Sequence, residues 1–355
     1  MPSLGVASGI KESVEGRRMT GSFFELFKGL ELKLADFSLF FVFAGKVGLF
    51  VLLALFLTTG AVMLESRIRE RLFGRKGKGF KQAFADMVRL MMQKPLQPGS
   101  SDKVLFFWVP IISFVASLFF LLMLPTGQDG EFLRLRGGLL YLLFAGVLFG
   151  YTFFLGGLAG GSRFSFLGAL RSLAETFSCQ LILMLTSGVV LMTAGSTDLS
   201  DIVSAQRDVW YVFIHFPMFI MFMLSLLTLT GGAPFGTSRG SYELSGGVYS
   251  EYSGGLYLFF KSADYILLLA GSLLSALLFF GGWNAFMFFG TEGSCWYLLA
   301  KTGILFCLFV LLRSSLPSYK TEDAMAISYK CFLPLSAIWF FVTAFFILFE
   351  GVGVQ

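Results

Sequence analysis

Residues 231–265 read GGAPFGTSRGSYELSGGVYSEYSGGLYLFFKSADY, a long polar stretch between two apolar runs. The stretch is rich in glycine, serine and tyrosine, and it carries Arg239, Glu243, Glu251, Lys261 and Asp264. Irregular backbone beside a membrane is tolerated where it is buried in protein or lines a wet cavity. Ionisable side chains are costly there, so these acids are candidates for a functional site. We therefore expect the rest of the chain to be a scaffold that holds this loop at a membrane surface.

The chain as a whole has the composition of an integral membrane protein. Its 355 residues are 56% hydrophobic and 14% charged, with a mean hydropathy of +0.78. Such values are typical of membrane proteins. The apolar residues are spread along the whole length, which favours one membrane domain over two soluble ones. The net charge of +5 is explained by the orientation of basic loops in a membrane. We therefore expect membrane lipids as partners and no nucleic acid.

The cysteines and the single histidine give no support for a metal or cofactor site. Cys179, Cys295, Cys307 and Cys331 form no CxxC pair and lie in or beside apolar runs, where cysteine usually acts as a small hydrophobe. His215 lies in an apolar run with no second ligand nearby. We expect no metal ligands and no histidine-based catalytic residues.

Eight apolar runs are each about the roughly 20 residues that a helix needs to cross the hydrocarbon. They cover residues 37–64, 104–124, 139–159, 176–194, 209–230, 265–289, 295–312 and 331–349. The predicted fold class is an all-α integral membrane protein with eight transmembrane helices in one domain, residues 37–350. Residues 1–36 form an N-terminal extension without a cleavable signal pattern. Within it, residues 22–36 are either a short amphipathic surface helix or an ordinary lead-in to the first span.

The long loops are predicted to share one side of the membrane. These loops are residues 65–103, 160–175, 231–264 and 313–330. The first contains ten Lys or Arg residues against four acids. Because basic loops stay on the inner side, these loops are expected to face the cytoplasm or the mitochondrial matrix. A docking surface for soluble partners belongs on the same side.

Four short motifs lie in order on these loops. They are QAFADMVR (82–89) with Lys94-Pro95; FSFLGALR (164–171); Pro234-Phe235 with Glu243-Leu244, Gly247 and EYSG (251–254); and Leu316-Pro317 with Tyr329-Lys330 and Pro334. Each motif is weak alone, but together the chain resembles the family of NADH:quinone oxidoreductase chain 1, the H subunit of respiratory complex I. That membrane subunit closes the quinone chamber. The resemblance runs from about Glu65 to Leu335.

The resemblance implies a quinone chamber and the start of a proton relay. The implied residues are Glu65, Arg67, Asp86, Arg89, Arg171, Glu175, Pro234, Phe235, Glu243, Glu251 and Asp264. Our hypothesis is that Glu243, Glu251 and Asp264 form a shortened acidic relay; the alternative is that they pair with basic residues of this chain or of partners. Apolar residues also recur at helical spacing over 80–92, which fits either a surface helix beside the quinone entrance or a generic amphipathic helix.

Several residues depart from the family pattern. Gly236, Arg239 and Ser241 stand where the family has a run of acids, and Leu229 and Gln180 stand at two further acidic positions, although Glu175 lies one turn before Gln180. The resemblance therefore implies the fold of this chain and its place in the complex more strongly than it implies the detailed proton path.

As a family member the chain would act as a subunit of an H⁺-translocating NADH:ubiquinone reductase and would not be catalytic alone. Ubiquinone would be the substrate, and this subunit would bind no cofactor itself. Flavin and iron–sulfur clusters would belong to partner subunits of the peripheral quinone module, and other partners would be adjacent membrane-arm subunits.

Two other functions remain open from the sequence. One is the homologous subunit of a membrane-bound hydrogenase, which handles no quinone. The other is a stand-alone ion or solute transporter, for which matched internal repeats would be the marker. As for the compartment, the 45 phenylalanines and the drift from the family pattern favour the mitochondrial inner membrane over a bacterial plasma membrane.

Overall fold

The computed structural model describes residues 48, 51, 53–72, 74, 80–99, 101–127, 137–232, 247–285 and 294–352. The chain divides into two compact units, residues 1–56 and 57–355, and all helices from residue 57 onward belong to the second. Every regular element among the described residues is helical, which confirms the all-α prediction. The N-terminal extension, residues 1–36, lies outside the described residues.

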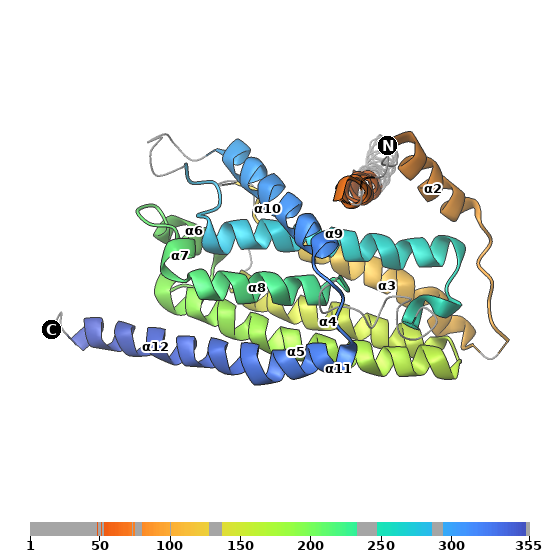
Figure 1. The fold of residues 1–355 in the computed structure, drawn as a ribbon. Coiled ribbons are helices and arrows are strands. Elements are labelled where there is room, and N and C mark those ends of the chain that lie inside the picture. Colours follow the sequence, from red (N-terminus) through yellow and green to blue (C-terminus); the bar gives the residue numbers. More distant parts are fainter. Residues whose placement is uncertain are drawn as a thin grey trace, which may run out of the picture. The chain divides into compact units, whose positions relative to one another are not determined.

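Figure 1 shows the order of the helices along the chain. In chain order they are residues 57–72, α2 (Phe80–Met92), α3 (Lys103–Leu122), α4 (Gly138–Ala159), α5 (Arg163–Ala194), α6 (Leu199–Ala205), α7 (Tyr211–Ile214), α8 (Phe216–Leu229), the 3-10 turn η2 (Gly247–Glu251), α9 (Gly254–Phe279), α10 (Cys295–Ser315), α11 (Thr321–Ile327), the π-helical turn η3 (Ser328–Phe332) and α12 (Leu333–Val352).

Six stretches among these residues are long and apolar enough to cross a membrane. They are Lys103–Leu122, Gly138–Ala159, Arg163–Ala194, Gly254–Phe279, Cys295–Ser315 and Thr321–Phe349. Each contains or overlaps one of the eight predicted spans. Half of the predicted first span, 37–64, lies outside the described residues, namely 37–47, 49, 50 and 52.

The predicted span 209–230 is interrupted. The helix α7 ends at Ile214, His215 leaves the helical conformation with φ −115° and ψ 43°, and α8 begins at Phe216. Pro217 lies in the first turn of α8, where its missing N–H costs no hydrogen bond. The result is a 14-residue helix in place of one long span.

The helix α5 begins earlier than the hydropathy of the sequence predicts. It starts at Arg163 rather than at 176, capped by the Ser162 hydroxyl, which accepts from the Ser165 N–H at 3.2 Å. Ser165, Ser172 and Glu175 are buried against the rest of the protein. Because their polar groups face protein rather than lipid, the helix continues through a segment whose composition is typical of a loop.

The core is organised around α9. This helix lies between α10 and α8, with α3 also packed against it (Figure 1). In its apolar window 94% of the residues are buried, against 28% for α10 and 11% for the last span. Phe279 packs against Phe219 and Phe222 of α8 at ring distances of 5.4 and 5.3 Å. Since lipid tails are as apolar as leucine, the exposed apolar side chains of α10 and α12 suit a membrane setting.

Candidate functional site

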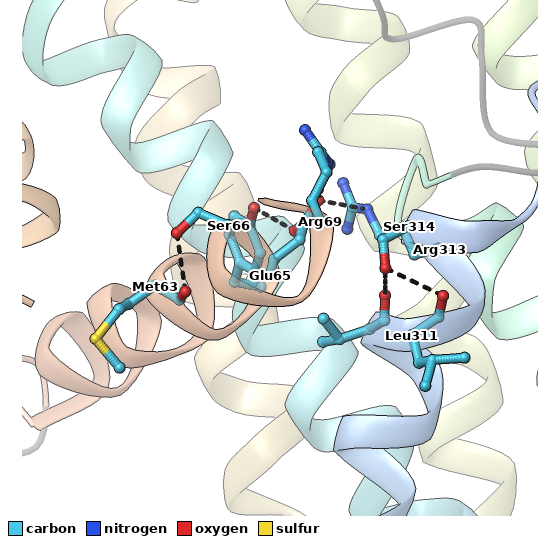
Figure 2. Close-up of polar contacts among 9 residues, drawn as sticks. Met63, Glu65, Ser66, Arg69, Leu311, Arg313 and Ser314 are labelled. Atoms are coloured by element: carbon cyan, nitrogen blue, oxygen red, sulfur yellow. Dashed lines mark hydrogen bonds and ion pairs between the residues drawn. The ribbon is translucent and has the colours of Figure 1, made fainter. Parts of the chain in front are cut away.

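The site is centred on Glu65, which is only 4% exposed. A carboxylate this deeply buried requires partners. Tyr265 of α9 donates its hydroxyl to Glu65 Oε2 at 2.6 Å, and Arg69, one turn further along the same helix, forms an ion pair with Oε1. Arg313 Nε of α10 lies 3.7 Å from Oε1. Figure 2 shows Glu65 and Arg69 beside Arg313, so two helices distant in the sequence meet here with α9.

Arg313 is far more enclosed than Arg69, the other arginine of the site. Its side chain is 8% exposed, and its guanidinium carbon lies 5.5 Å from the centre of the Tyr265 ring. Gly232, at the end of the described residues after α8, permits this placement, because a Cβ there would lie 2.9 Å from Arg313 Cδ. Within the described part of the chain, Arg313 Nη1 is buried and has no hydrogen-bond partner.

Asp264 and Lys261 extend the site along α9. Asp264 is 2% exposed and accepts a hydrogen bond of 2.5 Å from the Tyr249 hydroxyl. Lys261 Nζ lies 5.5 Å from the centre of the Tyr265 ring and close enough to Asp264 and Glu65 to interact with both electrostatically. Because Tyr249 belongs to η2, its hydrogen bond ties the turn after the polar loop to α9.

We call this set the charged cluster; it comprises Glu65, Arg69, Lys261, Asp264 and Arg313, with the tyrosines Tyr249 and Tyr265. It holds two acids and three bases. Charges in such a low-dielectric setting act strongly on one another, and a buried pair persists only with good hydrogen bonds. The cluster can therefore respond to a charge or a proton that arrives nearby. Among the described residues no group of His, Cys, Asp and Glu could hold a metal ion.

The structure brings together two of the predicted site residues, Glu65 and Asp264, around Lys261 and Arg313. Glu251 lies in η2, and its side chain is beside Gly160 at the α4–α5 turn, where a Cβ on the glycine would come within 3.1 Å of Glu251 Cγ. The other predicted members of the polar loop lie outside the described residues; they are Pro234, Phe235, Glu243 and, among the departures, Gly236, Arg239 and Ser241.

The remaining predicted residues are spread over three helices. Arg67 is exposed on helix 57–72, while Asp86 and Arg89 lie on α2, whose bounds agree with the amphipathic segment 80–92. Arg171 is half-buried in α5, and Glu175 is buried in the same helix.

Gln180 and Leu229 occupy positions that the family pattern makes acidic. The Gln180 amide is buried in α5 and donates through Nε2 to the Leu143 carbonyl at 2.7 Å. Leu229 is 1% exposed in α8. Neither side chain carries charge, so neither position supplies an acid.

The N-terminus of α9 is fixed by contacts with the segment that follows α2. The Leu96 N–H donates to Ser253 Oγ at 2.9 Å. Gly254 adopts φ +62°, and a Cβ there would lie 2.5 Å from the Gln93 carbonyl oxygen. Burial raises the pKa of Tyr252, so its hydroxyl stays protonated and donates to the Gly156 carbonyl at 2.9 Å. The helix that carries the charged cluster is thereby anchored at its first turn.

Sequence reasoning missed Arg69, Tyr249, Lys261, Tyr265 and Arg313 as site residues. Local spacing could have found Arg69, four residues after Glu65 on one helix, and Lys261, one turn before Asp264 and Tyr265. No local pattern pointed to Arg313, which meets Glu65 only through the packing of α10 on α9.

Comparison with known proteins relates the chain to one family. The family model described as NADH dehydrogenase matches residues 45–344. The H subunit of the NADH-quinone oxidoreductase of Pelagibacter ubique is 32% identical over 275 residues, covering 76% of this chain and 82% of the relative. That of Rhodospirillum centenum is 33% identical over 272 residues, covering 75% and 80%. That of Bacillus cytotoxicus is 31% identical over 319 residues, covering 87% and 95%.

Proposed function

Because the chain belongs to the NADH dehydrogenase family, we propose that it is the H subunit of an NADH-quinone oxidoreductase, a core membrane subunit of complex I. The match over residues 45–344 includes every described helix up to most of α12 and all members of the charged cluster. In this role the chain acts within an enzyme complex and has no catalytic activity alone. Flavin and iron–sulfur clusters belong to partner subunits.

The quinone chamber is the first part of this proposal. A quinone needs an apolar path for its isoprenoid tail and a polar end for its headgroup. The helix α2, with Asp86 and Arg89, supports a path at the membrane surface, because Met91, Met92 and Leu96 at its end are exposed apolar side chains. Arg67, Arg171, Pro234 and Phe235 stay in the proposal as chamber residues on the inner side. Ubiquinone is the proposed substrate.

The proton relay is the second part. Reduction of a quinone to a quinol takes up two electrons and two protons, and the change in charge acts on ionisable groups at the low-dielectric membrane edge. The observation that carries the proposal is the buried contact of Glu65 with Arg313 and Tyr265. Arg313 and Tyr265 stabilise the Glu65 carboxylate. A proton that reaches Glu65 weakens its attraction to Arg313, which frees the guanidinium to attract Asp264.

In this proposal the relay starts at Glu65 and Asp264, and Glu175, Glu243 and Glu251 are its further acids. Glu175 supports a continuation into α5, because it is a buried acid five residues before Gln180, and Gln180 cannot carry charge.

We extend the proposal to the membrane topology. Eight spans comprise the six long apolar stretches, the interrupted α7–α8 pair, and a first span that ends close to Glu65. The charged cluster then lies at the inner, positively charged side. The compartment is an energy-transducing membrane: the bacterial relatives support the plasma membrane, and the phenylalanine content supports the mitochondrial inner membrane.

The test is purification of the tagged full chain in mild detergent, followed by NADH:quinone reductase assays with and without a quinone-site inhibitor. We expect a large assembly with inhibitor-sensitive activity. Recovery with hydrogenase subunits and no quinone reduction would support the hydrogenase alternative. Recovery of the chain alone would favour a transporter and contradict the proposal.

A further inference from the structure

At the end of α9 opposite the charged cluster, three backbone carbonyls converge on one ammonium group. Lys301 Nζ of α10 donates to the carbonyl oxygens of Phe280, Gly282 and Asn284 at 2.7, 3.0 and 2.6 Å. An ammonium has three donors, so all of them are used. The carboxyl end of a helix carries partial negative charge, which further favours a cation here.

The backbone at this place has a shape that favours glycine. Gly281 and Gly282 have φ values of +68° and +51°, and a Cβ on either would lie 3.0 Å from Trp210 or 2.8 Å from Val203. Lys301 Nζ lies 4.4 Å from the centre of the Trp210 ring, within the range of a cation–π interaction. We call the three carbonyls and this ring the carbonyl cage.

The carbonyl cage is held mainly by α6 and its C-cap, and the N-cap of α10 adds one bond to the same segment, from the Ser294 N–H to the Trp283 carbonyl at 3.1 Å. Gln206 Oε1 accepts from the Gly281 N–H at 3.0 Å, and Gln206 Nε2 donates to the Leu277 carbonyl at 3.0 Å. Asn284 Nδ2 donates to the Val203 carbonyl at 2.7 Å. Because Gln206 and Val203 fix the cage segment from the side of α6, Lys301 is a link between α10 and a fixed point rather than a part of that point.

Arg313 lies at the other end of an inclined ridge of α10 that begins at Lys301. Lys301, Leu305, Phe309 and Arg313 are spaced by four residues, so they form one stripe. Leu305 and Phe309 are buried, as are Leu298, Phe306 and Val310, whereas the other residues of α10 are only partly buried or exposed. Lys301 and Arg313 are about 18 Å apart along the helix axis at 1.5 Å per residue. A helix with so narrow a contact depends on the polar contacts at its two ends to fix its position along α9.

We propose that Lys301 is a positioning residue: by filling the carbonyl cage it fixes the axial position of α10 and thereby places Arg313 against Glu65 and Tyr265. Lys301 does not touch the charged cluster and acts on it only through the rigid helix. The effect on activity rests on the proposed function of the cluster; the effect on α10 itself does not.

The first measurement follows α10 directly, by hydrogen exchange and mass spectrometry on the intact complex with Lys301→Met. We expect peptides that cover residues 308–316 to lose protection, while peptides from α3 keep theirs. The matched control is Thr302→Val, next in the sequence, whose hydroxyl donates to Leu299 O of its own helix. Unchanged protection at 308–316 in Lys301→Met would overturn the inference.

The second measurement asks whether Lys301 acts through Arg313. Lys301→Met is expected to lower inhibitor-sensitive quinone reductase activity by up to about a hundredfold, the loss that a misplacement of about 1 Å can cause. Because the effect passes through Arg313, combining it with Arg313→Lys should add little to the loss in Arg313→Lys alone. Losses that multiply, as for independent distant sites, would overturn the inference. If Arg313→Lys alone has no effect on activity, the proposed function of the charged cluster is wrong. The hydrogen-exchange measurement then decides by itself whether Lys301 positions α10.

Chemical rescue distinguishes two roles of Lys301: joining α10 to the carbonyl cage, and only placing a positive charge beside the three carbonyls. In Lys301→Ala, added methylammonium can occupy the carbonyl cage without being joined to α10. We expect no recovery of activity or of protection at 308–316, and recovery would overturn the inference by showing that the cage needs only a cation. If Lys301→Met fails to assemble, Lys301→Arg takes its place in the first two measurements, because it keeps the charge but replaces the compact ammonium with a planar fork.

Discussion

Glu65 can remain buried because its two oxygens are shared between a hydroxyl and two guanidinium groups. The Tyr265 hydroxyl donates to Oε2, while Arg69 and Arg313 form ion pairs with Oε1. The two arginines are not equivalent, since the Arg69 side chain is 51% exposed and that of Arg313 is 8% exposed. Solvent weakens the first pair, so Arg313 is the partner that matters most for the buried carboxylate.

Replacing Arg313 should therefore cost far more than replacing an exposed arginine. Removing one partner of a buried pair typically costs roughly 3–5 kcal/mol, because the other charge is left buried. We expect Arg313→Met to lower the temperature at which the purified complex loses quinone reductase activity. Arg71→Met, exposed on the same helix as Glu65, is the control and should leave that temperature unchanged. Equal stability of the two variants would contradict the assignment.

The Tyr265 hydroxyl should matter in the same way. Tyr265→Phe keeps the ring against Arg313 but removes the donor to Glu65, and an unmet buried charged acceptor costs about 1–3 kcal/mol or more. We expect lower thermal stability and lower quinone reductase activity. Tyr151→Phe, on an exposed tyrosine of α4, should change neither. Wild-type activity in Tyr265→Phe would show that the hydrogen bond from Tyr265 to Glu65 does not contribute to the function of the site.

At the scale of elements, the sequence predicted the apolar parts of the helices better than their polar beginnings. Hydropathy placed the cores of α3, α4, α10 and α12 correctly, because each is a continuous apolar run. It put the start of α9 at 265 instead of Gly254, because Lys261 and Asp264 look like loop residues when their partners are unknown. Glu65 and Tyr265 are 200 residues apart, and only tertiary packing brings them together.

The start of α9 should tolerate a side chain at one glycine and not at its neighbour. Gly254 has φ +62° and faces the Gln93 carbonyl oxygen, whereas Gly255 has nothing within 4 Å of an added Cβ. Gly254→Ala should separate the segment after α2 from α9, seen as faster limited proteolysis at residues 93–99 and lower quinone reductase activity. Gly255→Ala should behave as wild type. Identical proteolysis of the two variants would show that this contact does not hold the segment.

At the scale of the whole molecule, the family could be inferred from four motifs in order, and the comparisons bear it out. The relay of Glu243, Glu251 and Asp264 stays a prediction. Its acids were chosen from one loop, while the structure assembles Glu65 and Asp264 with cations from α9 and α10. A charged cluster of this kind depends on which faces of distant helices meet, and motif order alone does not fix that.

The central claim is that the charged cluster couples quinone reduction to proton movement, and the most direct test is the number of protons translocated per NADH oxidised. The measurement uses the purified complex in sealed vesicles, with Glu65→Gln and, as a control, Glu322→Gln, an exposed acid of α11. We expect Glu65→Gln to lower the ratio, because the amide cannot exchange charge with Arg313, and Glu322→Gln to keep it. A wild-type ratio in Glu65→Gln, at wild-type assembly, would contradict the account.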